Sequence, residues 1–347
     1  MTRVHQALSG VGPYDAVSTQ AQAWRELLGR WGMEGEVYAD SIDPRTGDGV
    51  RPLRELDPDP DDLVVIRYSA YAPSLRPLLA LDRPKLLVYH NVTPPRYLWN
   101  HHPGVAVACA LGRDQLPRYV RAVDVAAADS LFNASELELA GASEPRVVPI
   151  LFEPERLLEQ GPEPKGDGPL VLVVGRLVPN KRHDLAIAAF ASYQRELAPD
   201  ARLMLVGEPL SPSYRLLIER LARASGARSV SVTGGVPQPV LNSLYARADV
   251  LLSTSEHEGF CVPLLEAFHF GVPVVARPAG AMPEVGGDAV LWSDDSRPGM
   301  LSELLDIAVR DRELRQELAR RGRRRLEHFS YERTAEHIRG AVDAALA

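Results

Sequence analysis

Short runs of apolar residues recur along the chain, and most are followed by a stretch with helical spacing. A first strand is expected over residues 3–8, before a helical pattern over residues 16–31. Further strands are expected at 36–39, 63–67, 86–89, 123–127 and 146–150, and those at 63–67 and 86–89 are almost entirely apolar. Uninterrupted apolar runs of this length are typical of strands that a parallel sheet buries on both faces. Alternation of such strands with helices predicts an α/β fold.

The second half of the chain repeats this alternation after a polar break. Residues 159–168, EQGPEPKGDG, are hydrophilic and rich in glycine and proline, as expected of a linker. A chain of 347 residues is also longer than one core usually supports. The sequence therefore predicts two domains, residues 1–160 and 161–330, followed by a final helix over residues 331–347. The strands expected after the break are 169–175, 202–206, 229–233, 250–252 and 272–276.

Composition restricts the classes of function. The formal net charge is −7, whereas a nucleic-acid-binding domain is usually basic, so we expect no nucleic-acid partner. No apolar run approaches the roughly 20 residues that span a bilayer, and the first residues lack a signal-peptide layout. We therefore expect a cytoplasmic protein without a transmembrane segment. Cys109 and Cys261 fall in different predicted domains and suggest neither a disulfide nor a metal site.

The most informative stretch runs from residue 250 to residue 285. An apolar run at 250–252 predicts a strand, and a polar loop leads into a helix expected from Cys261 to Phe270. Gly271 is placed to end that helix. Glu258 lies in the loop and Glu266 in the helix, with seven residues between them.

This arrangement suits a nucleotide sugar. A helix N-terminus offers unpaired N–H groups and a partial positive charge to a phosphate. Here the donors would come from Gly259, Phe260, Cys261 and Val262, and Gly259 would let the backbone approach a ligand closely. An ionised carboxylate can accept hydrogen bonds from two neighbouring hydroxyls. The two glutamates could therefore bracket a diphosphate, one holding a ribose and the other a hexose.

A second motif begins the second domain. The apolar run at 169–175 ends in Gly175, and Arg176 and Lys181 flank the short loop that follows. Two cations beside a glycine turn at the end of a strand are well suited to a diphosphate.

Both motifs resemble those of retaining glycosyltransferases with the GT-B fold, in particular glycosyltransferase family 4. The spacing of Glu258 and Glu266, followed by Gly-Val-Pro-Val-Val from Gly271, resembles the E-x7-E signature. Gly175, Arg176 and Lys181 resemble the phosphate-binding element of the same family. The resemblance implies two Rossmann-like parallel-sheet domains that face a central cleft. The first domain would bind the acceptor, the second the nucleotide-sugar donor, and the final helix would pack back on the first.

The resemblance also implies the chemistry. A sugar would move from a UDP- or GDP-sugar to an acceptor hydroxyl, with retention at the anomeric carbon and without a metal ion or another cofactor. Arg176 and Lys181 would stabilise the departing phosphate. Glu266 would orient the ribose, and Glu258 the sugar hydroxyls.

Other positions follow from the same family. The backbone near Gly235 and Val236 would contact the base. Gly10 and Gly12 lie in a loop that faces the cleft in the family, although a tight turn is an alternative; without a third glycine they make an incomplete dinucleotide fingerprint. His90 follows the run at 86–89 and could donate a hydrogen bond to a sugar hydroxyl, or serve structure alone.

Several alternatives stay open at this stage. The acidic loop at 57–62 contains the Asp-x-Asp pattern of metal-dependent transferases, but its alternating prolines favour a solvated loop. A GT-B sugar-nucleotide 2-epimerase would consume the nucleotide sugar without an acceptor. A non-catalytic sugar-binding protein would bind free sugar rather than UDP or GDP. The acceptor could be a small molecule, a lipid-linked sugar or a polysaccharide.

Overall fold

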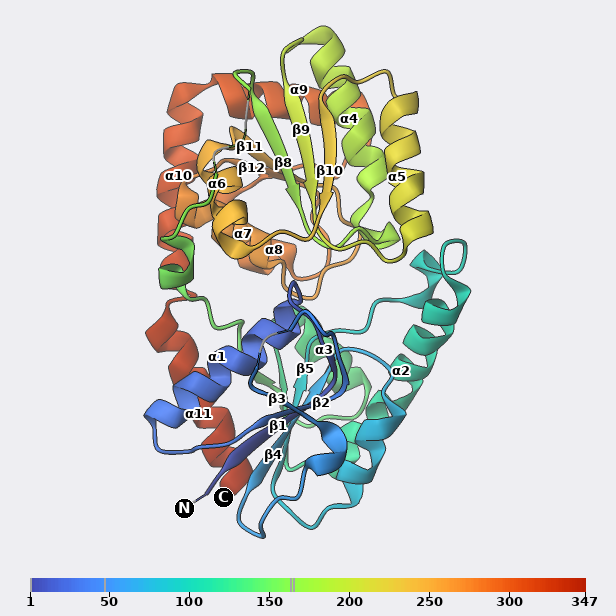
Figure 1. Ribbon diagram of the computed structural model, residues 1–347. Helices are drawn as coiled ribbons and strands as arrows, with labels where there is room; N and C mark the ends of the chain where they lie inside the picture. The colour runs from blue at the N-terminus through green and yellow to red at the C-terminus, as the bar shows by residue number, and fades with distance from the viewer. Residues whose placement is uncertain (1, 47, 163, 165) are drawn as a thin grey trace. The chain divides into compact units, whose positions relative to one another are not determined.

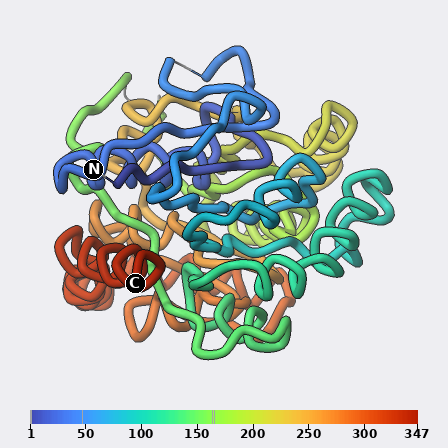
Figure 2. Tube along the Cα trace, turned by 90° about the horizontal axis from the view of Figure 1, so that it is seen from below, coloured from blue at the N-terminus to red at the C-terminus, as the bar shows by residue number. Residues whose placement is uncertain are grey.

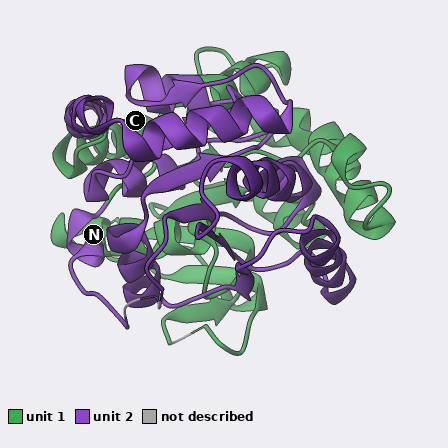
Figure 3. Ribbon diagram, turned by 90° about the horizontal axis from the view of Figure 1, so that it is seen from above, with its two compact units in different colours: residues 1–152, 329–347 green, residues 153–328 purple. Residues whose placement is uncertain are grey.

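The chain folds into two compact units in a computed structural model that describes residues 2–46, 48–162, 164 and 166–347. Residues 1–152 and 329–347 form unit 1, and residues 153–328 form unit 2 (Figure 3). The tube in Figure 2 runs from the blue N-terminus to the red C-terminus, and both ends belong to unit 1. The division after residue 152 comes before the expected linker at 159–168. Glu163 and Lys165 of that linker lie outside the described residues.

Residues 153–161, which include the start of the expected linker, belong to unit 2. Side chains of helix α6 (Gln238–Arg247) bind their backbone. The Asn242 side-chain amide donates to the carbonyls of Arg156 and Glu159, at 3.0 and 2.7 Å. The Ser243 hydroxyl donates to the carbonyl of Gly161 at 2.8 Å. A polar composition alone could not show that these carbonyls accept hydrogen bonds from side chains of unit 2.

Unit 1 contains a sheet of seven parallel strands in the order β3-β2-β1-β4-β5-β6-β7. Residues on β4 alternate between the two faces, both of which are covered, so the whole strand is buried and every residue of it except Arg67 and Tyr68 is aliphatic. Its strands are β1 (Val4–Val11), β2 (Val37–Ile42), β3 (Val50–Pro52), β4 (Leu63–Tyr68), β5 (Lys85–Tyr89), β6 (Val125–Ala128) and β7 (Arg146–Val147).

Helices cover both faces of this sheet. One core lies under α1 and α11 and includes Trp24, Val65 and Ile338. The other lies under α2 and α3 and includes Ile66, Leu116 and further residues from the opposite side of β4 and β5. The α-helices of unit 1 are α1 (Ala16–Arg30), α2 (Pro103–Ala122), α3 (Leu131–Leu139) and α11 (Tyr331–Leu346), and its 3-10 turns are η1 (Leu53–Glu55), η2 (Pro73–Ala80) and η3 (Pro95–Tyr97).

Unit 2 contains a sheet of six parallel strands in the order β10-β9-β8-β11-β12-β13. The order reverses direction between β8 and β11, so the loops after these two strands leave from neighbouring positions at one edge, a place where ligands of open α/β sheets bind. Its strands are β8 (Leu170–Val174), β9 (Arg202–Val206), β10 (Val230–Gly234), β11 (Val250–Ser253), β12 (Val274–Ala276) and β13 (Leu291–Trp292).

The helices of unit 2 also lie on both faces of their sheet (Figure 1). One core joins α4, α5 and α9 to the strands through residues such as Phe190, Ile218 and Leu305. On the other side α7 packs against α6, α8 and α10. With α6 these are η4 (Pro154–Leu157), η5 (Pro179–Lys181), α4 (His183–Glu196), α5 (Pro212–Ala224), α7 (Val262–Phe270), α8 (Met282–Gly286), η6 (Gly287–Ala289), α9 (Pro298–Arg310) and α10 (Arg312–Glu327).

The expected strands are present, with ends that differ by no more than three residues. Two strands were missed. β3 and β13 are only three and two residues long, and each carries too few apolar positions to produce a pattern. No helix among the described residues is both long and apolar enough to cross a membrane.

Candidate functional site

The strand, loop and helix expected around the two glutamates form as a continuous unit. β11 ends at Ser253, and α7 begins at Val262, one residue later than expected. Cys261 caps the helix in a left-handed conformation with φ of 81°, which is uncommon for a residue with a side chain. Gly271 ends the helix in the same conformation, with φ of 67°. The left-handed residue at each end fixes where α7 starts and stops.

The structure brings Lys181 and Glu258 into direct contact. The Lys181 ammonium donates to the Oε1 atom of Glu258. The Ser255 hydroxyl donates to the same oxygen at 2.7 Å. The Lys181 side chain is 21% exposed and the Glu258 side chain 8% exposed, so the pair is largely shielded from water. A cation and a carboxylate from the two sequence motifs thus meet at one point.

Hydrogen bonds to backbone carbonyls join the loops that carry this pair. The Thr254 hydroxyl donates to the carbonyl of Lys181 at 3.0 Å. The Glu256 N–H donates to the carbonyl of Asn180 at 2.8 Å, and the Asn180 side-chain amide donates to the carbonyl of His257 at 3.1 Å. Because these bonds cross between the loops after β8 and β11, the two loops are held in one arrangement.

Two glycines open space beside Lys181. Gly175 follows β8 with φ of 146°, and a side chain there would start 3.8 Å from the Lys181 Nζ atom. Gly207, with φ of 150°, lies so close that an added Cβ would be 2.0 Å from the Gly175 carbonyl oxygen. Arg176 is exposed directly after Gly175. The end of β8 therefore has a residue without a side chain between two cations, which leaves room beside Lys181.

Glu266 lies inside unit 2 and is held by α6. The Tyr245 hydroxyl donates to its Oε2 atom at 2.8 Å, and the Tyr245 ring stacks on Phe270 with a centroid distance of 5.6 Å. Burial raises the pKa of Glu266, while hydrogen bonds from Tyr245 and Gln238 oppose that shift. The hydrogen bonds fix the position of the carboxylate, whose oxygens can accept from a diol when it is ionised.

The remaining donor-site positions are also in unit 2. Gly235 and Val236 are half-buried in the turn between β10 and α6. Gly259 and Val262 are half-buried at the start of α7, whereas Phe260 and Cys261 are buried.

The two glycines of unit 1 differ from expectation. Gly10 lies within β1 and pairs with Ser41, because the strand extends to Val11 instead of ending near residue 8. Gly12 does lie in the following turn, where its N–H donates to the Ser18 hydroxyl at 3.1 Å. The loop expected from residue 9 is thus shorter at its start than the sequence suggested.

His90 occupies a buried network in unit 1. Arg67 donates to its Nε2 atom at 3.0 Å, and its Nδ1 atom lies 2.9 Å from Asp129. A guanidinium can only donate, so Nε2 accepts and Nδ1 donates to Asp129. Arg67 stacks over Trp24 at 4.5 Å and is itself buried. In this arrangement His90 has no N–H left for a sugar hydroxyl, and the expected role would require the ring to leave these partners.

The acidic loop at 57–62 is tied to the N-terminal strand. Arg3 donates to Asp59 at 2.5 Å and to Asp62 at 2.7 Å. Burial raises the pKa of Asp62, but the hydrogen bonds from Arg3 outweigh it and lower the pKa to about 2. Asp62 is buried, which corrects the expectation of a fully solvated loop. In the described part of the chain, no cluster of three or more His, Cys, Asp or Glu side chains is arranged to hold a metal ion.

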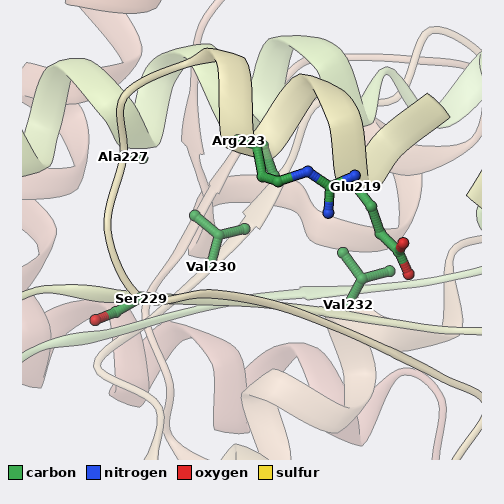
Figure 4. Close-up of a pocket in the computed structure, with 7 residues that line it drawn as sticks. Glu219, Arg223, Ala227, Ser229, Val230 and Val232 are labelled. Carbon is green, nitrogen blue, oxygen red and sulfur yellow. The ribbon is translucent and has the colours of Figure 1, made fainter. Parts of the chain in front are cut away.

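A hollow of about 340 Å³ lies elsewhere in unit 2, between α5 and the edge strand β10. Figure 4 shows the Glu219 and Arg223 side chains above Val230 and Val232. None of the residues expected in the donor site lines it. The hollow is open and sits at the outer edge of the sheet, so we do not assign it to the donor.

The second unit matches a known family. The family model described as "Glycosyl transferases group 1" matches residues 155–325. Residues 155–325 are therefore similar to a glycosyl transferases group 1 domain. Lys181, Glu258 and Glu266 all lie within this matched region, whereas Gly10, Gly12 and His90 lie outside it.

Curated relatives match about half of the chain or less. A D-inositol 3-phosphate glycosyltransferase from Segniliparus rotundus is 31% identical over 188 residues, which are 51% of this chain and 40% of the relative. A GDP-mannose-dependent alpha-(1-6)-phosphatidylinositol monomannoside mannosyltransferase from Mycolicibacterium smegmatis is 36% identical over 127 residues, 34% of this chain and 32% of the relative. The chain thus spans well under two thirds of the length of either relative.

Solved structures match nearly the whole chain in fold. Sucrose-phosphate synthase from Thermosynechococcus elongatus aligns with a TM-score of 0.77 at 18% identity, over 97% of each chain. WaaG, a glycosyltransferase involved in lipopolysaccharide biosynthesis, aligns with a TM-score of 0.74 at 18% identity, over 97% of this chain and 98% of that one. The chain has the GT-B fold of two Rossmann-like α/β units, and the predicted fold class is confirmed.

The sequence did not reveal the residues that hold the glutamates in place. Tyr245 bonds Glu266, and Ser255 bonds Glu258. Thr254 bonds the backbone beside Lys181. The polar run from Ser253 to Glu258 was a usable signal, since six consecutive polar residues at the end of a buried strand need hydrogen-bond partners. Tyr245 gave no comparable signal, because a tyrosine on a helix face is equally typical of a core.

Gly280 provides a direct test of how Glu258 is positioned. Its φ is 56°, and an added Cβ would lie 2.1 Å from the Glu258 carbonyl oxygen. The Gly280→Ala variant should therefore displace the Glu258 loop and reduce turnover of a nucleotide sugar by about 10- to 100-fold, as expected for misplaced catalytic groups. Gly226→Ala is the matched control, because Gly226 has φ of 75° but an added Cβ would contact nothing within 4 Å. Equal turnover in both variants would contradict the assignment.

His183 predicts how stability depends on pH. Burial, assisted by the charge of Lys181, lowers the pKa of His183 to about 4, against about 6.5 in an unfolded chain. Between these values only the unfolded chain binds the proton, so the free energy of unfolding should fall as the pH drops from about 6.5 towards 4. Between pH 7.5 and pH 5 this loss is about 2 kcal/mol.

Chemical denaturation at the two pH values measures this effect. The His183→Gln variant should lose about 2 kcal/mol less than the wild type over that interval. His337→Gln on the exposed side of α11 is the control and should behave like the wild type. The same pH dependence in wild type and His183→Gln would show that His183 is not held neutral by burial.

Proposed function

We propose that this chain transfers a sugar from a nucleotide diphosphate sugar to an acceptor hydroxyl, with retention at the anomeric carbon and without a metal ion. The observation that carries the proposal is the contact between Lys181 and Glu258 at the adjoining ends of β8 and β11. This contact joins a phosphate-binding type of side chain to a hydroxyl-binding type within the region that matches the group 1 family. The proposed retention at the anomeric carbon rests on the resemblance to glycosyltransferase family 4.

The donor would be held by unit 2. Its diphosphate would lie at the start of α7, where the positive end of the helix favours an anion. Glu266, fixed by Tyr245, would accept hydrogen bonds from the ribose diol, and the base would rest beside Gly235 and Val236. The printed name of one relative specifies GDP-mannose, which supports testing GDP-sugars first.

The reaction breaks the bond between the anomeric carbon and the diphosphate oxygen. Negative charge grows on the leaving diphosphate, and Lys181 and Arg176 would stabilise it, the electrostatic effect that usually contributes most to catalysis. The acceptor oxygen bonds to the anomeric carbon on the face that the diphosphate leaves. The departing phosphate takes the acceptor proton, so no side-chain base is required. Glu258 would hold the sugar hydroxyls beside the reacting carbon.

The acceptor and the place of reaction are further parts of the proposal. The relatives' names mention inositol phosphate and phosphatidylinositol mannoside, so both a small molecule and a lipid-linked sugar are reasonable candidates. A polysaccharide is a third. The cytoplasmic location stays a prediction.

A screen of UDP-, GDP-, ADP- and dTDP-sugars tests the proposal. Each sugar nucleotide would be incubated with the protein, and release of the nucleoside diphosphate would be measured with and without mixed acceptors. Thermal shift would report binding in parallel.

We expect one nucleotide class to raise the melting temperature and to be consumed faster with an acceptor. If the nucleotide sugar is consumed at the same rate without any acceptor, an epimerase or hydrolase is favoured instead. If only free sugar binds, the chain is a sugar-binding protein.

A further inference from the structure

The two side chains expected at different parts of the donor bind each other in the free protein. Lys181 and Ser255 both donate to the Oε1 atom of Glu258. Among the described residues, no hydrogen-bond donor contacts the other oxygen, Oε2. We propose that Lys181 and Glu258 exchange partners when the donor binds, and that the exchange makes the site prefer a nucleotide sugar to a free nucleoside diphosphate. This inference rests on the proposed function.

The exchange can occur through side chains alone. The backbone around the pair is held by the bonds from Thr254 to Lys181 and between Glu256 and Asn180. A lysine ammonium, in contrast, sits on a flexible four-carbon stem and can redirect its three donors. Gly175 leaves space within 4 Å of the Lys181 Nζ atom, on the side where β8 ends. Lys181 can therefore turn towards a phosphate without moving either loop.

The electrostatic consequence falls on Glu258. Its side chain is 8% exposed, and a largely buried carboxylate that loses its cation is costly. After Lys181 moves to a phosphate, Ser255 would still donate one hydrogen bond to Oε1. The remaining acceptor positions, including Oε2, would need new donors. Two neighbouring hydroxyls of a sugar supply them, because a carboxylate can accept from both.

A nucleoside diphosphate and a nucleotide sugar therefore differ in whether Glu258 gains new hydrogen-bond donors. A nucleoside diphosphate takes Lys181 away and gives Glu258 nothing in return. A nucleotide sugar takes Lys181 away and gives Glu258 its hydroxyls. The free protein should consequently bind a nucleotide sugar in preference to the product nucleoside diphosphate, which would aid product release. Glu258 would cause this preference, because it gains hydrogen-bond donors only from the sugar. Lys181 would couple the preference to phosphate binding, because it leaves Glu258 when a phosphate binds.

Calorimetric titration of four probes tests the exchange: GDP, GDP-mannose, UDP and UDP-glucose. The pair that binds the wild type is then titrated into the Glu258→Gln variant, which keeps the shape of the side chain but removes its charge. We expect the free diphosphate to bind about 10-fold more tightly to this variant, since Lys181 no longer has to leave a carboxylate. We expect the preference for the nucleotide sugar over the diphosphate to shrink in the same variant.

Two further variants isolate the pair. Glu256→Gln is the matched control, because Glu256 lies in the same loop but pairs with Arg182, and it should leave the preference unchanged. In a Lys181→Met background the Glu258→Gln change should no longer strengthen diphosphate binding, since the competing cation is absent. Thermal unfolding of each variant confirms that it is folded before titration.

The outcomes separate this inference from the proposed function. If the wild type binds a diphosphate and its sugar, but Glu258→Gln leaves the diphosphate affinity unchanged or weaker, the exchange is overturned while the donor site stands. An equal gain in Glu256→Gln would also overturn it, because the effect would then be general to the loop's charge. If none of the four probes binds the wild type, the proposed function itself fails for these two nucleotide classes.

Discussion

Replacing Lys181 with alanine is expected to reduce turnover of the nucleotide sugar by about 100-fold or more. This is the scale on which loss of one preorganised contact to a developing charge lowers a rate. The effect should fall mainly on kcat. Lys181 pairs with a carboxylate in the free protein, and its interaction with the diphosphate is strongest when additional negative charge develops on the leaving group. Steady-state kinetics with the preferred nucleotide sugar measures it.

Stability must be separated from catalysis in this variant. Loss of Lys181 leaves the largely buried Glu258 without its cation, which should lower the free energy of unfolding by about 3 kcal/mol. Rates should therefore be compared at a temperature where both proteins are folded. Arg223→Ala is a suitable control, because this cation lies in the hollow beside α5, which shares no residue with the expected donor site. An unchanged kcat in folded Lys181→Ala would remove Lys181 from the mechanism.

The second large effect is expected at Glu266. Replacing Glu266 with alanine should weaken nucleotide binding by about 10- to 100-fold, since hydrogen bonds to a charged acceptor contribute about 1.5–3 kcal/mol. The nucleoside diphosphate and the nucleotide sugar should be affected alike, because both carry the ribose. Calorimetric titration of both ligands measures the change.

Tyr245→Phe offers a graded companion to that variant. It removes the hydrogen bond that fixes the Glu266 carboxylate but keeps the ring that stacks on Phe270. We expect a smaller loss of nucleotide affinity, in the same direction as the loss in Glu266→Ala. Glu266→Ala with undiminished affinity for both ligands would show that the ribose is held elsewhere.

The parts of the fold that were predictable are those with uniform apolar runs. β4, β5 and β8 are buried on both faces, so most of their residues are apolar. The strand, loop and helix around the glutamates were also predictable, because Gly271 marks the end of α7 clearly. Short edge strands such as β3 and β13 were not, since they bury few side chains.

The candidate site was predictable in its charged residues but not in their contacts. The spacing of Glu258 and Glu266 and the position of Lys181 are sequence features. The contact between Lys181 and Glu258 is not, because it depends on how the loops after β8 and β11 meet across the sheet. The His90 network is a clearer failure of prediction, since nothing near His90 in sequence indicated that Arg67 would occupy one of its ring nitrogens.

A crystal structure of the protein with a bound nucleoside diphosphate, GDP or UDP, would test the central claim most directly. The account predicts that the diphosphate lies at the N-terminus of α7 within hydrogen-bonding distance of the Lys181 ammonium, with the ribose hydroxyls on Glu266. A nucleotide bound away from both residues, for example in the hollow between α5 and β10, would contradict it.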